Sequence, residues 1–387
     1  MNKKINIVFI VCVFLYLCSG LFLTILGRKD INDYENRTAY KLPKIKIDTI
    51  LDKTYQDDTE LAFSDQTLLS TTIKKGYNFL SNSITSKASN IILKNNCDNK
   101  YINVGKLIST FGCDNNIIYY YTYIEDSKVE YDNRIENINK IIEKTDVPLY
   151  LYYIEKDTDI NFETNEKSNI YNYLSDNIDT TNFYKFEINN FEEFSNNFYK
   201  TDHHWNHKGS YKAYQQLVEI LTKDNALNPL EEVCLNDNFS GSKANYSGAS
   251  LIYKETFCAY RFENLNMDVY VNGKKSSYGD SKYHFDNPLS EITYGTFYGA
   301  DYGEVIFDNK NANKENILII GESYDNAILS LIATHFNKTF SIDLRSYEME
   351  NNKKFNYLEY IKENSIDKVL LIGNRDYFKS SDFNMEV

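Results

Sequence analysis

The sequence predicts an α/β protein built on a parallel sheet, with one membrane-spanning helix at its amino terminus. Short aromatic and branched runs alternate with amphipathic stretches from about residue 117 to 221 and again from 317 to 372. Strands that alternate with helices in this way pair in parallel. The uncharged run Ile5–Leu26 is as long as the ~20 residues that cross a bilayer. The 387 residues, 42% of them hydrophobic, suffice for one large or two ordinary domains.

The amino-terminal run is best explained as an uncleaved signal anchor. Two lysines precede it, and it is longer than the apolar region of about 7–15 residues in a cleaved signal peptide, which is the alternative. Because no second long apolar run follows, we expect everything after residue 28 to lie outside the cell. The expected parts are a cytoplasmic tip and anchor (1–27), a juxtamembrane linker (28–58) and one α/β domain (59–387).

The first half of that domain shows helical and then strand-like patterns. Residues 59–93 have apolar side chains at helical spacing. Ile117–Tyr121 and Pro148–Ile154 have the pattern of buried strands, and between them Ile135 and Ile138 mark one face of a helix. We expect this strand-helix-strand unit to be parallel. Two further elements follow: a strand at Asn182–Ile188 and a helix that opens near Lys208 and Gly209.

The second half begins with a β-rich insertion at about 225–312. Its alternating run Met267–Val271 leads into Asn272-Gly273, which is a strong hairpin signal. The parallel pattern then returns. The predicted elements are strands at Ile317–Ile320, Lys338–Asp343 and Lys368–Ile372 and helices at Asp325–Phe336 and Phe355–Glu363.

The net charge of −13 argues against a nucleic-acid-binding surface, which needs clustered Lys and Arg to neutralise phosphates. A neutral or cationic glycan suits an anionic surface better.

The cysteines are compatible with an oxidising compartment. Two of the six lie in the apolar run, and the other four allow two disulfides. Pairing of sequence neighbours would give Cys97–Cys113 and Cys234–Cys258. Two other connectivities, or buried free thiols, remain open.

Two short stretches carry the candidate chemistry. Asp202-His203-His204-Trp205 places an acid and two imidazoles side by side, and Gly321-Glu322-Ser323 ends an apolar strand in a tight turn before a predicted helix. A serine hydroxyl needs a general base, and the base needs a group that fixes its tautomer. Ser323, His204 and Asp202 fill these three roles, and we expect the Ser323 backbone N–H to help hold an oxyanion.

Three other interpretations of these residues stay open. Ser323 is also a suitable helix N-cap. His203 and His207 have the i, i+4 spacing of a zinc pair, but the glutamate of the metalloprotease motif is missing between them. The imidazoles can also be structural groups satisfied by backbone carbonyls. We predict neither a metal nor a cofactor.

The stretch Thr201-Asp202-His203-His204-Trp205, followed by Gly209, resembles the signature of the DHHW family. That family is similar to the membrane-anchored alginate O-acetyltransferase accessory proteins of the SGNH hydrolase-like superfamily. The match extends to Tyr34-Glu35-Asn36-Arg37 with Pro43, to Gly321-Glu322-Ser323-Tyr324 and to Ile342-Asp343-Leu344-Arg345, so it covers essentially the whole chain. It implies a three-layer α/β/α fold.

The resemblance also implies roles for single residues. His204 is then the base, Asp202 its orienting carboxylate and Ser323 the nucleophile, with His203 as a neighbouring group and Trp205 packed behind the loop. Glu322 departs from the commoner Asp at its position. The oxyanion donors of the superfamily have weaker counterparts here, and the candidates are Gly373, Asn374 and Arg345.

The implied function is acetyl transfer onto, or off, a cell-surface or exopolysaccharide glycan through an acyl-enzyme. The implied partner is a membrane-bound O-acyltransferase that delivers the donor, which would explain an anchor in the lipid bilayer. Two alternatives remain: a carbohydrate acetylesterase with the same triad, and a non-catalytic scaffold that binds a glycan or an assembly partner.

Overall fold

The computed structural model describes residues 3–27, 29, 31–32, 37–45, 54–67, 69–74, 76–77, 100–105, 108–112, 116–119, 124–246, 250, 253–263, 265–276, 285 and 292–386. The chain divides into two compact units. The first comprises Met1–Asn95 and Ala244–Ile252, and the second comprises Asn96–Lys243 and Tyr253–Val387.

The first unit contains the predicted apolar helix. In α1 (Lys3–Leu26), the segment Ile7–Leu26 is long and apolar enough to cross a membrane. Its other elements are the antiparallel pair β1 (Ile31–Asn32) and β2 (Arg37–Thr38) and the helix α3 (Thr54–Gln66). Buried Asp65 of α3 accepts hydrogen bonds from the Asn32 side chain (2.9 Å) and the Tyr40 backbone N–H (2.9 Å), which ties β1 and the segment after β2 to the helix.

Several sequence predictions fall on parts that the structure leaves undescribed. The helices expected over 59–93 are represented by α3 and by helical residues up to 77. Residues 78–93 lie outside the described residues, as do Tyr34-Glu35-Asn36 and the expected Cys97–Cys113 pair.

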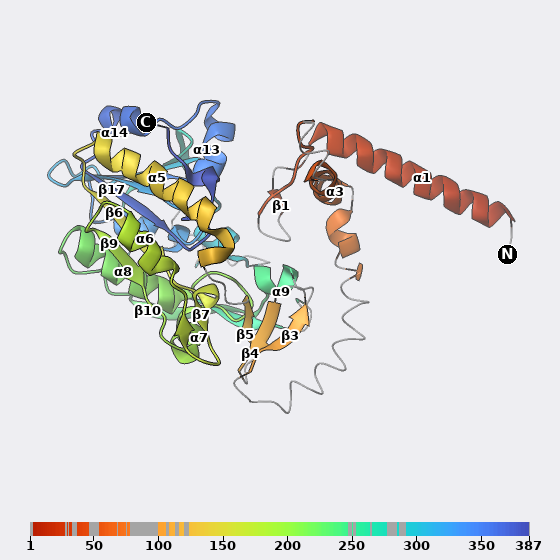
Figure 1. Cartoon of the computed structure of the whole chain (residues 1–387), viewed down its shortest axis with the longest axis horizontal. Helices are drawn as coiled ribbons and strands as arrows, with labels where there is room; N and C mark the ends of the chain where they lie inside the picture. Colours follow the sequence, from red (N-terminus) through yellow and green to blue (C-terminus); the bar gives the residue numbers. More distant parts are fainter. Residues whose placement is uncertain are drawn as a thin grey trace. The chain divides into compact units, whose positions relative to one another are not determined.

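The second unit is organised on an eight-stranded sheet (Figure 1). The strand order is β13-β12-β14-β16-β15-β17-β6-β9. In that order the strands are Lys274–Ser276, Asp268–Val271, Glu304–Asp308, Lys338–Ile342, Asn316–Ile320, Lys368–Gly373, Leu149–Ile154 and Phe183–Phe186. The five strands from β16 to β9 are parallel, and the other three pairings are antiparallel. The predicted α/β class with a mostly parallel sheet is therefore confirmed.

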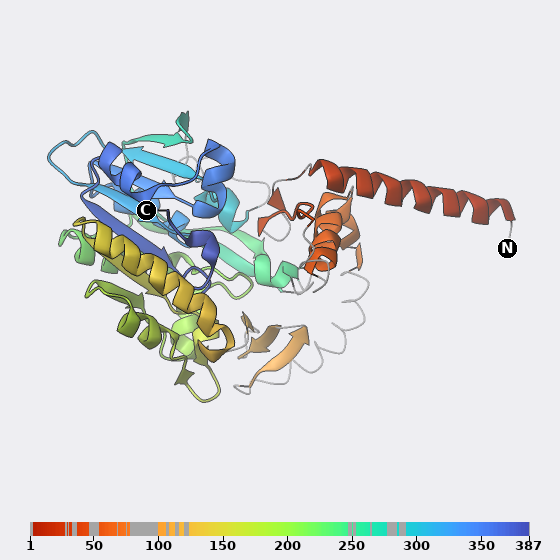
Figure 2. The same cartoon turned by 45° about the horizontal axis from the view of Figure 1, so that its top comes forward.

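Helices cover both faces of this sheet. Successive side chains of a strand point to opposite faces, so an apolar strand needs cover on both sides. In β15, Ile317 and Ile319 pack on one side, and Leu318 and Ile320 on the other. The first side faces α8 (His207–Leu221) and α12 (Leu329–Ala333). The second faces α5 (Lys128–Lys144), α6 (Ile170–Asn177), α13 (Leu344–Asn351) and α14 (Tyr357–Glu363), as Figures 1 and 2 show. The result is a three-layer α/β/α arrangement.

The predicted β-rich insertion has two parts. β10 (Glu231–Phe239) and β11 (Glu255–Arg261) form an antiparallel pair, joined by a disulfide between Cys234 and Cys258. This confirms one of the two expected cysteine pairs. The predicted hairpin at Asn272-Gly273 joins β12 and β13, which with β14 extend the main sheet in antiparallel order.

Two local predictions are wrong. The strand at 117, β5 (Asn116–Tyr119), pairs with β4 (Ile108–Phe111), and β4 pairs with β3 (Ile102–Gly105), in a separate antiparallel sheet. It does not pair with β6, so the expected first strand-helix-strand unit is absent. The helix expected over Asp325–Phe336 is divided into the 3₁₀ turn η3 (Asp325–Ala327) and the short α12.

The remaining elements are short. They are η1 (Ile124–Ser127), η2 (Asp157–Asp159), β7 (Ile160–Asn161), β8 (Glu166–Lys167), α7 (Phe191–Asn197), α9 (Ser242–Tyr246), α11 (Tyr294–Tyr298) and η4 (Ser381–Phe383).

Candidate active site

The Asp-His-His-Trp stretch lies in the loop between α7 and α8, and the two ends of this loop are packed together. Asn206 caps α8, because its side-chain oxygen accepts from the backbone N–H groups of Lys208 and Gly209. A side chain at position 209 would come within 2.1 Å of the Asn197 carbonyl oxygen, so only glycine permits this approach of α8 to the end of α7. The loop between the two helices is thereby held at the carboxyl end of the sheet.

The structure brings the three predicted triad residues into one hydrogen-bonded chain. Ser323, which follows β15, has its Oγ 2.8 Å from His204 Nε2. His204 Nδ1 lies 2.6 Å from Asp202 Oδ1. A proton on Nδ1 donates to the carboxylate and leaves Nε2 as the acceptor for the serine hydroxyl, which is the tautomer that a general base requires.

Asp202 is buried, and its carboxylate accepts three hydrogen bonds, the first of them from His204 Nδ1. Its Oδ1 also accepts from the His204 backbone N–H (3.0 Å), and its Oδ2 accepts from the Ser242 backbone N–H (2.6 Å). Burial by itself would raise the pKa of Asp202, but the two histidines and these hydrogen bonds hold it well below its usual range. Gly241 lies against it, since a Cβ there would be 2.3 Å from Asp202 Cβ.

The His204 ring is fully buried between aromatic rings. Tyr294 of α11 stacks on it with a centroid distance of 3.7 Å and an interplanar angle of 2°. The His203 ring lies 3.8 Å away on a tilted plane, and burial holds the pKa of His203 well below its usual value. The Tyr324 hydroxyl donates to the His203 carbonyl oxygen, and Trp205 packs edge-on against Tyr324. Trp205 therefore supports the loop from behind.

The turn that carries Ser323 is also closely packed. At position 321 a Cβ would lie 2.0 Å from Asp325 Oδ2, so the glycine is required. Glu322 is buried and accepts from the Asn374 backbone N–H (2.7 Å). Burial raises the pKa of Glu322 to about 7. Ser323 does not open a helix, because Tyr324 precedes only the three-residue η3.

The three oxyanion candidates occupy different environments. Arg345 is held by the carboxylates of Asp343 (3.0 Å from Nε) and Asp301 (2.9 Å). Gly373 ends β17, where a Cβ would lie 2.4 Å from Tyr377 Cβ. Asn374 donates its backbone N–H to Glu322, and its Oδ1 accepts from the backbone N–H of Asp376.

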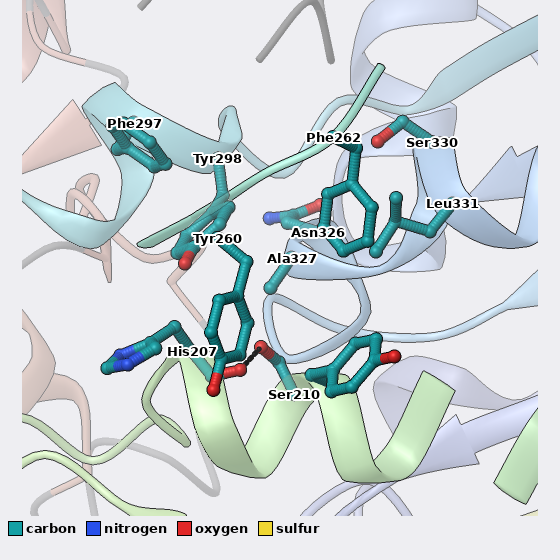
Figure 3. A pocket seen from close by; sticks show the side chains of 11 residues that line it. His207, Ser210, Tyr260, Phe262, Phe297, Tyr298, Asn326, Ala327, Ser330 and Leu331 are labelled. Carbon is teal, nitrogen blue, oxygen red and sulfur yellow. Dashed lines mark hydrogen bonds between the residues drawn. The ribbon is translucent and has the colours of Figure 1, made fainter. Parts of the chain in front are cut away.

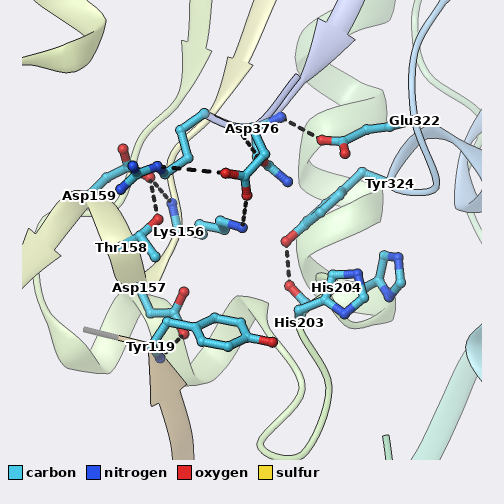
Figure 4. Close-up of polar contacts among 12 residues, drawn as sticks. Tyr119, Lys156, Asp157, Thr158, Asp159, His203, His204, Glu322, Tyr324 and Asp376 are labelled. Atoms are coloured by element: carbon cyan, nitrogen blue, oxygen red, sulfur yellow. Dashed lines mark hydrogen bonds and ion pairs between the residues drawn. The ribbon is translucent and has the colours of Figure 1, made fainter. Parts of the chain in front are cut away.

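Charged groups surround the site on the side of β6 (Figure 4). Lys156 Nζ lies 3.2 Å from Asp376 Oδ2, and the buried Lys243 Nζ lies 2.6 Å from Asp157 Oδ2. Tyr119 of β5 donates its backbone N–H to the same Asp157 oxygen (2.9 Å). The buried Lys243–Asp157 pair anchors the turn whose Ser242 N–H holds Asp202.

A cavity of about 50 Å³ lies nearby, lined largely by aromatic rings (Figure 3). Its walls include His207, Tyr260, Phe262, Tyr298 and Asn326, and none of the triad residues lines it.

The structure does not bring together the His203–His207 pair that the i, i+4 spacing suggested as metal ligands. Among the described residues, Asp202, His203 and His204 have potential ligand atoms within 4.8 Å of one another, whereas His207 lies outside this group and contacts Glu232 through Nε2 (3.0 Å). The short contacts of Asp202 and His204 are those of the hydrogen-bonded chain described above.

Sequence reasoning missed four supporting residues. Tyr294, Gly241, Ser242 and Lys243 come from the insertion or its border, far from both motifs in sequence. Only tertiary packing brings them to the site, and the sequence contains no spacing that would have identified them.

Comparisons with known proteins show which fold this is. No family model and no curated protein matches the chain. A DHHW family protein from Eubacterium siraeum matches with a TM-score of 0.57 and 18% identity, over 74% of this chain and 98% of that one. Bacillus cereus PatB1 with a sulfonyl adduct matches with a TM-score of 0.55 and 18% identity, over 75% of this chain and all of that one. The chain thus shares the α/β fold of the DHHW family protein and of PatB1.

Proposed function

We propose that the protein is a membrane-anchored, extracytoplasmic O-acetyltransferase that acts on a cell-surface or exopolysaccharide glycan. The observation that carries the proposal is the buried chain from Ser323 Oγ through His204 to Asp202, with contacts of 2.8 and 2.6 Å. The distant structural similarity to PatB1, a peptidoglycan O-acetyltransferase, supports the reaction class. The terminal apolar helix and the disulfide favour an extracytoplasmic location.

In the first step Ser323 Oγ bonds to the carbonyl carbon of an acetyl donor while its proton passes to His204 Nε2. Asp202 stabilises the imidazolium and keeps its orientation. When the tetrahedral intermediate collapses, the leaving oxygen of the donor takes that proton and the acetyl group remains on Ser323. An acceptor hydroxyl then attacks the ester, gives its proton to His204, and Ser323 leaves with that proton.

Oxyanion stabilisation belongs to the same proposal. The Ser323 backbone N–H is one donor. Asn374 is the second, because its Oδ1 is already engaged with the Asp376 N–H (2.7 Å), which leaves Nδ2 as a donor. Arg345 is less suited, since two carboxylates hold it.

The donor and the partner are also proposals. A membrane-bound O-acyltransferase would bring acetyl groups across the bilayer, and an uncleaved α1 would keep this chain beside it. The expected acceptor is a neutral or cationic polysaccharide, in keeping with the net charge of −13.

The test uses the full chain in detergent with p-nitrophenyl acetate as donor. We expect p-nitrophenol release from wild type and its loss in Ser323→Ala and His204→Ala. Phenylmethylsulfonyl fluoride should form a covalent adduct on Ser323, identified by peptide mass spectrometry, and should fail to do so in the Ser323→Ala variant. Unchanged release from both variants would refute the triad.

A second arm separates transfer from hydrolysis. With an oligosaccharide acceptor present, an acetylated oligosaccharide indicates a transferase, whereas acetate alone indicates a carbohydrate acetylesterase. A folded wild type that neither releases p-nitrophenol nor reacts with the sulfonyl fluoride would indicate the third class, a glycan- or partner-binding scaffold.

A further inference from the structure

The ring of Tyr294 lies against the base of the triad in an unusual geometry. Its plane is within 2° of the His204 plane at a centroid distance of 3.7 Å, so the rings are in face-to-face contact. Most aromatic pairs in proteins are offset or tilted instead. The Tyr294 hydroxyl donates to the Tyr324 carbonyl oxygen (3.1 Å). Neither sequence motif includes Tyr294.

Tyr294 connects the base to the turn that carries the nucleophile. Tyr324 follows Ser323 directly and donates its own hydroxyl to the His203 carbonyl oxygen. The chain of contacts therefore runs from the His204 ring through Tyr294 and Tyr324 back to the histidine loop. Such a closed set of contacts limits rotation of the imidazole about its bond to Cβ.

His204 takes up a proton during the proposed reaction, and its ring has no exposed surface. The groups that face it are Asp202 at Nδ1, Ser323 at Nε2, and the rings of His203, Tyr324 and Tyr294. The only formal negative charge in this contact set is Asp202. The electron-rich face of a tyrosine ring attracts a cation, and the attraction is stronger where water is excluded.

We propose that Tyr294 is a positioning residue that holds the His204 ring toward Ser323 and stabilises its protonated form through the ring face. The inference rests on the proposed function for its kinetic consequence. Its effect on His204 protonation does not depend on turnover. The effect on His204 protonation can therefore be tested separately from the effect on the reaction rate.

The test compares Tyr294→Leu, Tyr294→Phe and Tyr298→Leu. The leucine at 294 removes the ring face, and the phenylalanine keeps the face but loses the hydroxyl. Tyr298 is the matched control: it lies on the same short helix with its ring 4.9 Å from Tyr294, and no ring contact joins it to His204 among the described residues. A folded state is checked for each variant by circular dichroism.

The first readout is the pH midpoint of His204 protonation, followed by imidazole NMR signals that are assigned with His204→Gln. We expect Tyr294→Leu to lower the midpoint by about 1 to 1.5 pH units, because the attraction between a cation and a ring face is of that size where water is excluded. Tyr294→Phe and Tyr298→Leu should keep it near the wild-type value. An unchanged or raised midpoint in Tyr294→Leu would overturn the proposal, even if the enzyme is active.

The second readout is acetyl release by the wild type and the same variants. Tyr294→Leu should lower kcat about tenfold with KM nearly unchanged and move the acid limb of the pH profile to lower pH. A loss of kcat with no movement of that limb would mean a purely structural role and would also overturn the proposal. If wild type shows no turnover, the proposed function fails, and the NMR midpoint still decides the inference.

Discussion

Replacing Gly241 by alanine should disable the triad although none of its three residues is substituted. Gly241 lies between β10 and α9, and its N–H donates to the Thr201 hydroxyl (2.9 Å). Its φ is outside the left-handed region, so the effect of alanine depends on space alone. A Cβ at this position would lie 2.3 Å from Asp202 Cβ, 2.4 Å from its Oδ2 and 2.7 Å from its Cα.

The size of the effect follows from these distances. Ordinary van der Waals contact begins at 3.4 Å, so the shortest of them is too close by 1.1 Å. The Asp202 backbone is among the atoms met, and a change of rotamer therefore cannot relieve the clash. A displacement of about 1 Å in a catalytic group costs roughly 100-fold in rate, or about 2.7 kcal/mol in the activation free energy. Overpacking should also lower the free energy of unfolding by about 1–3 kcal/mol.

The assay is kcat/KM for p-nitrophenyl acetate, with the unfolding midpoint measured on the same samples. The matched control is Gly76→Ala, because a Cβ at position 76 meets no atom within 4 Å. We expect the control to keep wild-type activity. A Gly241→Ala protein that stays within threefold of wild type would refute the claim that this turn positions Asp202.

Three further predictions concern charge and covalent structure. Asp202→Asn should lower kcat about 10⁴-fold, because an amide favours the wrong His204 tautomer; a loss below tenfold in steady-state kinetics would count against the assigned role. The pKa of Glu322 in the folded state, about 7, lies above its ordinary value of 4.5. Between these two values the folded chain binds more protons than the unfolded chain. The free energy of unfolding therefore falls as the pH rises through this window, by at most about 3 kcal/mol. Glu322→Gln should weaken that dependence in denaturant unfolding at pH 5 and 8, and an identical dependence in both proteins would contradict it. Replacing Cys234 and Cys258 by serine should cost about 3 kcal/mol of stability, given their separation of 24 residues; equal unfolding midpoints for wild type with and without reductant would argue against the disulfide.

Local pattern accounted for much of the sheet. The apolar runs that became β15, β17 and β6 are buried on both faces, so continuous hydrophobicity predicts them well. Pattern was a poor guide at β5, whose buried residues look the same but lie in a separate antiparallel sheet. Hydrophobicity shows that a strand is buried, but it does not identify the strand with which it pairs.

The sequence by itself determined the apolar amino-terminal helix, the α/β class and the two motifs that meet at the candidate site. Each depends on residues close together in the chain: an uncharged run, alternating periods, and Asp202, His204 and Ser323 in short local patterns. Only the tertiary structure decided how far the motifs approach, with Ser323 Oγ 2.8 Å from His204 Nε2. It also decided that Tyr294, from the insertion, covers the His204 ring and that the Gly241 turn holds Asp202. These contacts join residues between about 40 and 120 positions apart, and their geometry is set by packing of the whole sheet and its helices, which no local pattern encodes.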